Sequence, residues 1–283
     1  MIRPTLPRLF ALASVTLLPG CAMFGGGDAK AKPVVDPSTI PVTVLYNHGV
    51  DALEAQRYKV AVTQFDLVQE NYPYSPWSTN AMLMQAYAQY LLAQYSSAIS
   101  TLDHFIQLHP TQHDIAYAYY LRALCYYEQI EDVQRDQKST VQAMGALREV
   151  VNRFPDSAYA RDARLKIDLC NDHLAGYEMS IGRWYEGQHL YTAAIGRFQR
   201  VVDDFQTTNH VPEALHRLIE IYLKLGLVNE ARRTAAVLGY NYPGSVWYST
   251  SYRNLVRDGD VQTASGPKHP VRQGGGGLFG SIF

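Results

Sequence analysis

The segment YSSAISTLDHFIQLHP (residues 95–110) contains the pattern that decides the fold. Ala98, Leu102 and Phe105 follow one another at offsets of four and seven from the alanine, which places them on one stripe of an α-helix. Pro110 disfavours helical backbone at the residue before it, so we expect the helix to end there. The small Ala98 permits close approach of a neighbouring helix, and the larger residues fill the space beside it. The segment therefore predicts an amphipathic helix that packs on a partner.

The same pattern occurs in five copies, spaced 37, 45, 51 and 37 residues apart. Each copy has an alanine twelve residues before a proline, except the fourth, which has Gln206 in the proline position. The alanines are Ala61, Ala98, Ala143, Ala194 and Ala231, and the prolines are Pro73, Pro110, Pro155 and Pro243. Upstream of the copies lie further apolar-periodic stretches, for example residues 44–56, 80–93, 116–127 and 219–225.

Helix pairs that recur at about 34 residues with this placement of alanine, aromatic and proline are typical of tetratricopeptide repeats. Gly49 and Gly182 match the small residue of the first helix, and Tyr185 matches its aromatic residue. We therefore predict an all-α, superhelical solenoid of about five helix pairs over residues 42–257. Its repeats are expected to end near residues 73, 110, 155, 206 and 243.

Two insertions account for the longer spacings of 45 and 51 residues between copies of the repeat pattern. The charged stretch at 128–139 interrupts the third pair and predicts a loop or extended turn. Residues 158–175 are compatible with helix and precede the fourth pair, so its first helix is expected to be unusually long.

This architecture indicates a binding protein. One helix pair cannot bury its own apolar stripe, whereas stacked pairs bury a continuous one and present an extended concave surface to peptides or protein domains. No glycine-rich phosphate loop, nucleophile elbow or paired-cysteine metal spacing occurs. His104, His109 and His113 are close in sequence, but Pro110 interrupts the helical spacing that a shared metal would need. We therefore expect no enzyme, catalytic residue, metal or cofactor.

Charge and cysteine usage narrow the class further. The 283 residues include 25 basic and 26 acidic ones, and this balance does not favour a nucleic-acid partner. Cys125 and Cys170 both lie in helical stretches among apolar neighbours. We expect two buried free thiols, with a disulfide between them as the alternative in an oxidising compartment.

The N-terminus predicts export and lipid attachment. Arg3 and Arg8 precede an apolar run at 9–18 that is too short to span a bilayer but suits a signal peptide, here residues 1–20. Leu18-Pro19-Gly20-Cys21 resembles a bacterial lipobox, which implies lipidation at Cys21. The alternative is an ordinary secretory peptide with an incidental cysteine. Residues 21–41 are rich in Gly, Pro, Lys and Asp, a composition typical of a flexible tether.

Five sequence segments carry a specific resemblance to one protein family. They are ENYPYSPWS (70–78), FIQLHPTQHDIAYAYYLRAL (105–124), DVQRDQ (132–137), FPDSAYARDAR (154–164) and HLAGYEMSIGRWY (173–185). General repeat consensus does not supply them. With the lipobox, the spacer and the five repeats, the chain resembles the BamD family, the tetratricopeptide lipoproteins of outer-membrane β-barrel assembly. The likeness runs from about residue 44 to residue 248.

The resemblance implies a scaffold subunit of the β-barrel assembly (BAM) complex. Its implied partners are the periplasmic domains of BamA, unfolded outer-membrane β-barrel precursors and the other lipoproteins of the complex. Ala22 after the cysteine implies, by lipoprotein sorting rules, a lipid anchor in the outer membrane facing the periplasm. Carried over by position, Tyr72, Tyr74 and Trp77 would lie near the substrate and Arg197 toward BamA.

Two other functions stay open at this point. One is a periplasmic tetratricopeptide adaptor in cell-envelope or division complexes, and the other is an enzyme-associated adaptor or weak hydrolase. The glycine-rich tail at 258–283 is expected to be flexible. Its last apolar residues, Leu278, Phe279, Ile282 and Phe283, either have no fixed place or dock on a partner or on the protein's own repeats.

Overall fold

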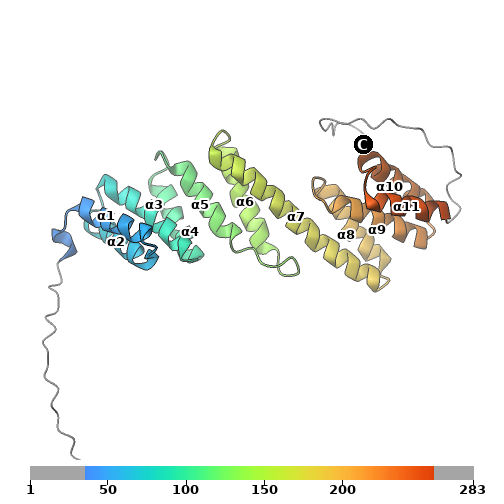
Figure 1. Ribbon diagram of the computed structural model, residues 1–283, viewed down its shortest axis with the longest axis horizontal. Helices are drawn as coiled ribbons and strands as arrows, with labels where there is room; N and C mark the ends of the chain where they lie inside the picture. Colours follow the sequence, from blue (N-terminus) through green and yellow to red (C-terminus); the bar gives the residue numbers. More distant parts are fainter. Residues whose placement is uncertain (1–35, 258–283) are drawn as a thin grey trace, which may run out of the picture.

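A computed structural model describes residues 36–257, and within this range the secondary structure is entirely helical (Figure 1). The signal peptide, Cys21, most of the tether and the glycine-rich tail lie outside the described residues. A short 3₁₀ helix (Pro37–Thr39) leads into the α-helices. These are α1 (Val42–Glu54), α2 (Tyr58–Asn71), α3 (Pro76–Leu91), α4 (Tyr95–Leu108), α5 (Ile115–Tyr127), α6 (Lys138–Arg153), α7 (Ala158–Gly187), α8 (Tyr191–Asp204), α9 (Val211–Lys224), α10 (Val228–Asn241) and α11 (Val246–Arg257).

The helices form five antiparallel pairs, from α1/α2 to α9/α10, and α11 closes the last pair (Figure 1). The predicted solenoid is therefore confirmed. Each second helix packs between its own partner and the first helix of the next pair. First helices also contact each other, α1 with α3, α3 with α5 and α5 with α7, whereas no two second helices in residues 36–257 do so comparably. In a curved stack the closer elements lie on the inner side, so the first helices line the inner face.

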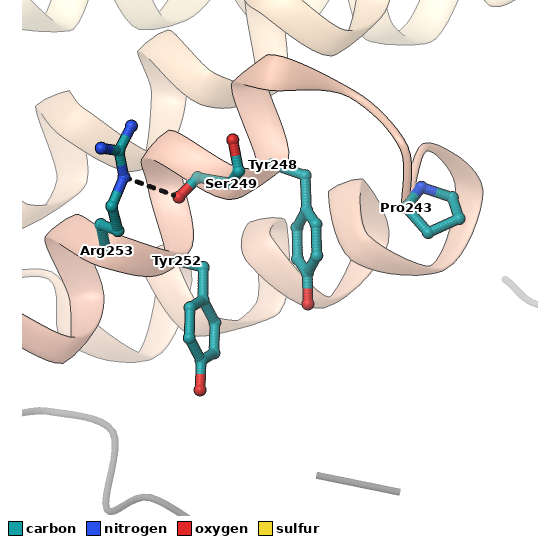
Figure 2. Close-up of a pocket in the computed structure, with 5 residues that line it drawn as sticks. All are labelled: Pro243, Tyr248, Ser249, Tyr252 and Arg253. Carbon is teal, nitrogen blue, oxygen red and sulfur yellow. Dashed lines mark hydrogen bonds between the residues drawn. The ribbon is translucent and has the colours of Figure 1, made fainter. Parts of the chain in front are cut away.

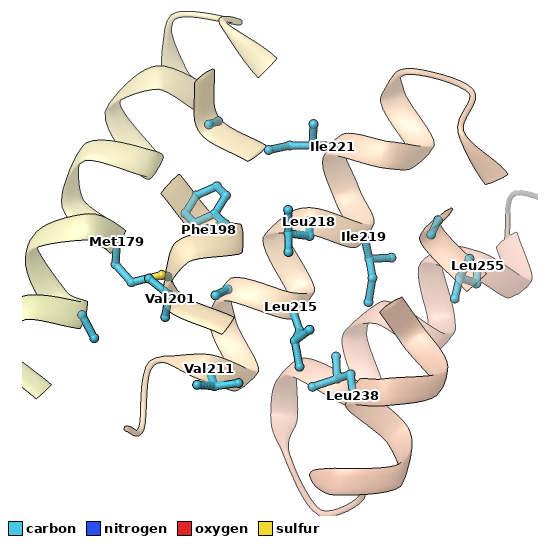
Figure 3. Close-up of a cluster of buried hydrophobic side chains, with 14 residues drawn as sticks. Met179, Phe198, Val201, Val211, Leu215, Leu218, Ile219, Ile221, Leu238 and Leu255 are labelled. Atoms are coloured by element: carbon cyan, nitrogen blue, oxygen red, sulfur yellow. The ribbon is translucent and has the colours of Figure 1, made fainter. Parts of the chain in front are cut away.

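The alanine positions are where the helices approach most closely. All five repeat alanines are completely buried, as are the aromatic residues Phe65 and Phe198 four positions later. In the C-terminal core, Phe198 and Val201 of α8 face Met179 of α7 and Leu218 of α9 (Figure 3). Apolar contact between neighbouring pairs thus continues along the stack, as in other repeat proteins.

Cys125 and Cys170 are both buried and free, as predicted. Burial raises the pKa of the Cys125 thiol to about 12 and that of Cys170 to about 11, because a thiolate would be poorly solvated there. Both thiols therefore stay protonated and unreactive at neutral pH.

The turns within pairs share one backbone feature. In four of the five pairs, one residue adopts a left-handed conformation: Gln56 (φ 57°), Ala93 (φ 57°), His189 (φ 58°) and Gly226 (φ 73°). Only the last is glycine, the residue that adopts this region without a steric penalty. The third pair is joined by a longer connection between α5 and α6, which confirms the loop predicted at 128–139.

Helix α7 has 30 residues, which confirms the prediction of an extended first helix in the fourth pair. The Ser157 hydroxyl caps it by accepting the Ala160 N–H at 3.0 Å. Its N-terminal half, with Ala163 and Cys170, packs in the core with α6, and its C-terminal half, with Met179, packs in the core with α8. One helix therefore belongs to two cores.

Two first helices begin several residues before the apolar-periodic stretches seen in the sequence. α3 begins at Pro76 rather than near residue 80, because Ser75 accepts the Trp77 N–H at 3.2 Å and proline fits the first helical position. Trp77 therefore lies in the first turn of α3. α9 begins at Val211, eight residues before the expected stretch. Despite the length of α7, no helix between residues 36 and 257 has the length and apolar character that crossing a bilayer requires.

Candidate protein-binding surface

The first helices of the second, third and fourth pairs carry a group of tyrosines that we call the tyrosine cluster. Its members are Tyr87 and Tyr90 of α3, Tyr117 and Tyr120 of α5, and Tyr159 of α7. All five are partly buried. The Tyr159 ring lies 5.6 Å from that of Tyr117 and 5.2 Å from that of Tyr120, in a stacked arrangement with the latter. The inner face thus carries an aromatic strip in which ring contacts join α5 to α7, and Tyr87 and Tyr90 lie on α3, the neighbouring first helix.

Two hydroxyls of the tyrosine cluster are held in place by hydrogen bonds. Tyr120 donates to the carboxylate of Asp162 on α7, and Tyr90 donates to Glu128 at 3.3 Å. Burial, followed by the nearby carboxylate of Glu128, raises the pKa of Tyr90 to about 12. Burial also raises the pKa of Tyr117 and of Tyr120, with the Asp162 hydrogen bond adding to it at Tyr120.

The chemistry of this strip suits a polypeptide ligand. The hydroxyls of Tyr90, Tyr117 and Tyr120 stay neutral over the physiological range, because the raised pKa of each lies above the ordinary value near 10. A tyrosine offers an apolar ring face together with a polar tip. A strip of them can contact an extended segment in which aromatic and polar residues alternate.

The three aromatic residues predicted at the substrate end lie around the turn between α2 and α3. Tyr74 is completely exposed. The Trp77 ring lies 4.9 Å from the Tyr46 ring of α1, and the Trp77 indole is partly exposed to solvent. Tyr74 and Trp77 are thus available to a ligand at the first inter-repeat turn.

Tyr72 has a different environment. It is half-buried, and its hydroxyl donates to the carbonyl oxygens of Ser38 at 3.2 Å and Ile40 at 2.7 Å. These hydrogen bonds hold the segment before α1 against the C-terminal end of α2. A contact between Tyr72 and substrate stays a prediction, while its bonds to the entering chain are structural.

The C-terminal part of the inner face is charged instead of aromatic. Arg183 of α7 pairs with Glu213 of α9 at 3.0 Å. Glu186 of α7 lies 3.4 Å from Lys224 and 3.7 Å from Arg217, both on α9. Arg183, Glu186, Arg217 and Lys224 line a hollow of about 360 Å³. We call this region the ionic surface, and it suits a polar, folded partner better than an apolar segment.

Arg197, predicted to face a partner, lies on α8 and is half-exposed. It donates to Glu178 of α7 at 3.0 Å, and Arg200 donates to the same carboxylate at 2.9 Å. The hydrogen bond from Arg197 to Glu178 is the main cause that raises the pKa of Arg197. Glu178 is only 9% exposed, so the two arginines neutralise a nearly buried carboxylate between α7 and α8. A partner contact at Arg197 stays a prediction.

Comparison with known proteins identifies the family. The family model described as "YfiO: Outer membrane lipoprotein" matches residues 38–238. A protein of Caulobacter vibrioides named outer membrane protein assembly factor BamD is 49% identical over 93% of this chain and 83% of its own length. Its namesake in Rickettsia prowazekii is 46% identical over 89% of this chain and 98% of its own length.

The chain belongs to the BamD family.

Two solved structures of tetratricopeptide proteins are similar to part of this chain. A thermophilic tetratricopeptide protein of Thermus thermophilus is 20% identical with a TM-score of 0.36, and covers 77% of this chain and 100% of its own. The tetratricopeptide domain of P58(IPK) is 15% identical with a TM-score of 0.40, and covers 77% of this chain and 56% of its own.

The tyrosine cluster was not predicted from the sequence. A signal was present, since Tyr87/Tyr90 and Tyr117/Tyr120 stand three residues apart on first helices, a spacing that puts each pair on one helix face. The missing information was that α3, α5 and α7 turn these faces to the same side.

Proposed function

We propose that this chain is a lipid-anchored scaffold subunit of outer-membrane protein assembly, tethered through Cys21, that binds unfolded β-barrel precursors and BamA. The observation that carries the proposal is the identity of 49% and 46% to two proteins named outer membrane protein assembly factor BamD. The distribution of chemistry along the inner face supports it.

The N-terminal half is the proposed precursor site. Tyr74, Trp77 and the tyrosine cluster offer ring faces and hydroxyls along successive first helices. An unfolded barrel strand alternates apolar and polar side chains, and it needs partners for both kinds until it is inserted. Binding through many weak aromatic contacts also permits release, because no single deep pocket has to be vacated.

The C-terminal half is the proposed BamA site. The ionic surface joins α7 and α9 through ion pairs, and Arg197 and Arg200 of α8 pair with Glu178 of α7. Charged groups at an interface contribute to specificity and orientation more than to affinity. They therefore suit a lasting contact with one folded partner, while the aromatic half accepts many different precursors.

Depletion of the chain tests the role in the cell. We expect the levels of many outer-membrane β-barrel proteins to fall together, since a shared assembly step is lost. If barrel levels hold while septation fails, the chain is instead an adaptor of a cell-envelope or division complex.

Site-specific photocrosslinking tests the placement of the sites. A photoreactive phenylalanine at position 74 or 87 should capture unfolded barrel precursors, and one at position 183 should capture BamA. Position 141, on the second helix α6 and 53% exposed, is the matched control on the outer face. Equal capture of precursors at position 141 would contradict an inner-face site.

A further inference from the structure

The hydroxyl groups of the tyrosine cluster are of two kinds. Tyr90 donates its hydroxyl proton to Glu128 at 3.3 Å, and Tyr120 donates its own to Asp162. A phenol has one proton to donate, whereas its oxygen also accepts. Since both protons are used inside the protein, each of these oxygens can only accept from a ligand. Hydrogen bonds in a chain polarise one another, so donation to a carboxylate also makes each oxygen a stronger acceptor.

The other three hydroxyls of the cluster keep their protons for a ligand. Those of Tyr87, Tyr117 and Tyr159 form no hydrogen bond within residues 36–257. The buried side-chain atoms of this range that have no hydrogen-bond partner are the Nε atoms of Arg122 and Arg217, so the three hydroxyls reach solvent. They are therefore able to donate outward.

The two kinds of hydroxyl lie side by side. On α3 and on α5 alike, a tyrosine with a free proton stands three residues before one that can only accept, which puts each pair on one helix face. Burial raises the pKa of Tyr117, and the neighbouring Tyr87, Tyr159 and Tyr90 add to the shift, so members from α3 and α7 flank this residue of α5. Donors and acceptors are thus interspersed along the inner face.

We propose that the tyrosine cluster binds the backbone edge of an extended polypeptide, in addition to its side chains. This inference rests on the proposed function, because it takes the cluster as the precursor site. The edge of an unpaired strand presents N–H and C=O groups in alternation. The hydroxyl oxygens of Tyr90 and Tyr120 accept from the N–H groups, and the free hydroxyls donate to the C=O groups.

A cationic side chain is the alternative ligand, because the cluster includes carboxylates. Asp162, however, already has the Lys166 ammonium of its own helix at 3.9 Å. The same ammonium lies 4.6 Å from the centroid of the Tyr127 ring, which also holds it at this place. The charge beside Tyr120 is therefore compensated, and neutral amide groups fit the neutral hydroxyls better than a lysine or an arginine does. Backbone recognition also suits precursors whose sequences differ.

Fluorescence polarisation with backbone-modified peptides tests the proposal. The probe is a fluorescein-labelled peptide of about ten residues, the length of a barrel strand, in which aromatic residues and serines alternate. Two further peptides carry esters in place of amides, one at the odd residues and one at the even residues, since successive N–H groups of a strand point to opposite edges. An ester removes the N–H donor and leaves the side chains unchanged. One ester peptide should bind at least about five-fold more weakly than the amide peptide, and the other should lose less.

Substitutions test the location of this effect. In the double variant Tyr90→Phe with Tyr120→Phe, the amide peptide should bind as weakly as the sensitive ester peptide binds to the unaltered chain. The ester should cost nothing further in this variant, because the acceptors are gone. Melting temperatures verify that the variant folds, and the ester comparison on the unaltered chain does not depend on it.

Tyr248 and Tyr252 of α11 supply a matched control. Their rings project to the same side of the helix (Figure 2), with centroids 6.3 Å apart. Neither hydroxyl donates to a carboxylate within residues 36–257. Tyr248→Phe with Tyr252→Phe should therefore leave the binding of all three peptides unchanged.

The possible failures of the two proposals are distinguishable. Equal binding of the amide peptide and both ester peptides overturns the backbone inference, and if Tyr117→Ala still weakens binding, the cluster remains the precursor site through side-chain contacts alone. Absence of saturable binding by every peptide overturns the precursor site as well. Ester peptides that bind equally, together with much tighter binding when lysines replace the serines, would identify a site for cations and also refute backbone recognition.

Discussion

Phe198 of α8 lies directly against Gly182 of α7, where a Cβ would stand only 2.5 Å from ring carbon Cε1. The same relationship holds between Phe65 and Gly49 in the first pair, again at 2.5 Å. The glycine of the first helix is therefore required by the phenylalanine of the second. Both glycines were identified from the sequence as the small position of the repeat.

Gly182→Ala should destabilise the protein by about 1–3 kcal/mol, because the completely buried Phe198 cannot move aside without strain. Gly196→Ala is the matched control, since a Cβ there meets nothing within 4 Å. It lies inside α8 and should stabilise the protein by about 0.5–1 kcal/mol through helix propensity. Urea unfolding of both variants measures the difference. A neutral Gly182→Ala would mean that the Phe198 ring has room to shift.

Ala93→Gly should stabilise the protein by about 0.5–1 kcal/mol. Ala93 has a left-handed backbone at φ 57°, which glycine adopts without a steric penalty. Gly226→Ala makes the reverse change at the equivalent turn of the fifth pair, where a Cβ meets nothing within 4 Å. It should therefore destabilise by a similar amount. Thermal melts that move in the same direction for both variants would contradict a purely conformational cause.

Arg122→Met should destabilise the protein by about 1–3 kcal/mol, because Asp103 loses its ion-pair partner and Glu149 keeps only Arg153. Arg122 is mostly buried and joins Asp103 of α4 to Glu149 of α6, with both distances at 2.6 Å. The exposed pair of Arg135 with Glu131 is the control, and Arg135→Met should cost less than about 1 kcal/mol. Chemical denaturation in low and high salt compares the two. Equal losses would show that the Arg122 link between the second and third pairs adds nothing.

Tyr72→Phe and Tyr74→Ala should separate stability from binding. Loss of the Tyr72 hydroxyl removes its bonds to Ser38 and Ile40, at a cost of about 1 kcal/mol. Tyr74 is completely exposed, so its removal should leave the melting temperature unchanged and weaken capture of unfolded barrel precursors. Co-precipitation with a labelled precursor measures the second effect. A Tyr74→Ala variant that melts early would show that this side chain is structural.

Stability should fall as the pH rises above about 9. The folded-state pKa of Cys125, Cys170 and Tyr90 is raised, so the native state retains protons that the unfolded state releases near the ordinary values of about 8.5 and 10. These groups therefore contribute full stability below those values and lose it as the pH rises. Urea midpoints between pH 7 and 11 record the decline.

A thiol-free variant tests the cause of the alkaline decline. Cys125→Ala with Cys170→Ala should flatten the slope between about pH 8 and 10, where unfolded thiols ionise, and leave the tyrosine-dependent fall above it. An unchanged slope in this variant would assign the decline to other groups.

The repeat pattern made the fold predictable from sequence. Ala98 and Pro110 mark where one helix approaches its neighbour and where it ends, and both properties depend on residues within a few positions. The start of α3 was harder, because Ser75 and Pro76 form a cap that apolar periodicity does not reveal.

The candidate site was less predictable because its members are distant in sequence. Tyr117 and Tyr159 are 42 residues apart, and their contact depends on how α5 and α7 turn within the stack. Tyr72 and Tyr74 show the opposite difficulty. They are two residues apart, yet one bonds to the entering chain and the other is free in solvent. Sequence spacing indicated the segment correctly and could not separate these two environments.

Tyr159 and Glu186 lie near opposite ends of α7, the helix shared by two cores. An unbroken helix of 30 residues is about 45 Å long and resists bending. Two ligands bound at opposite ends of α7 would therefore be held at a fixed separation. A displacement of one end would be transmitted through the rigid helix to the other end, instead of being absorbed at a hinge.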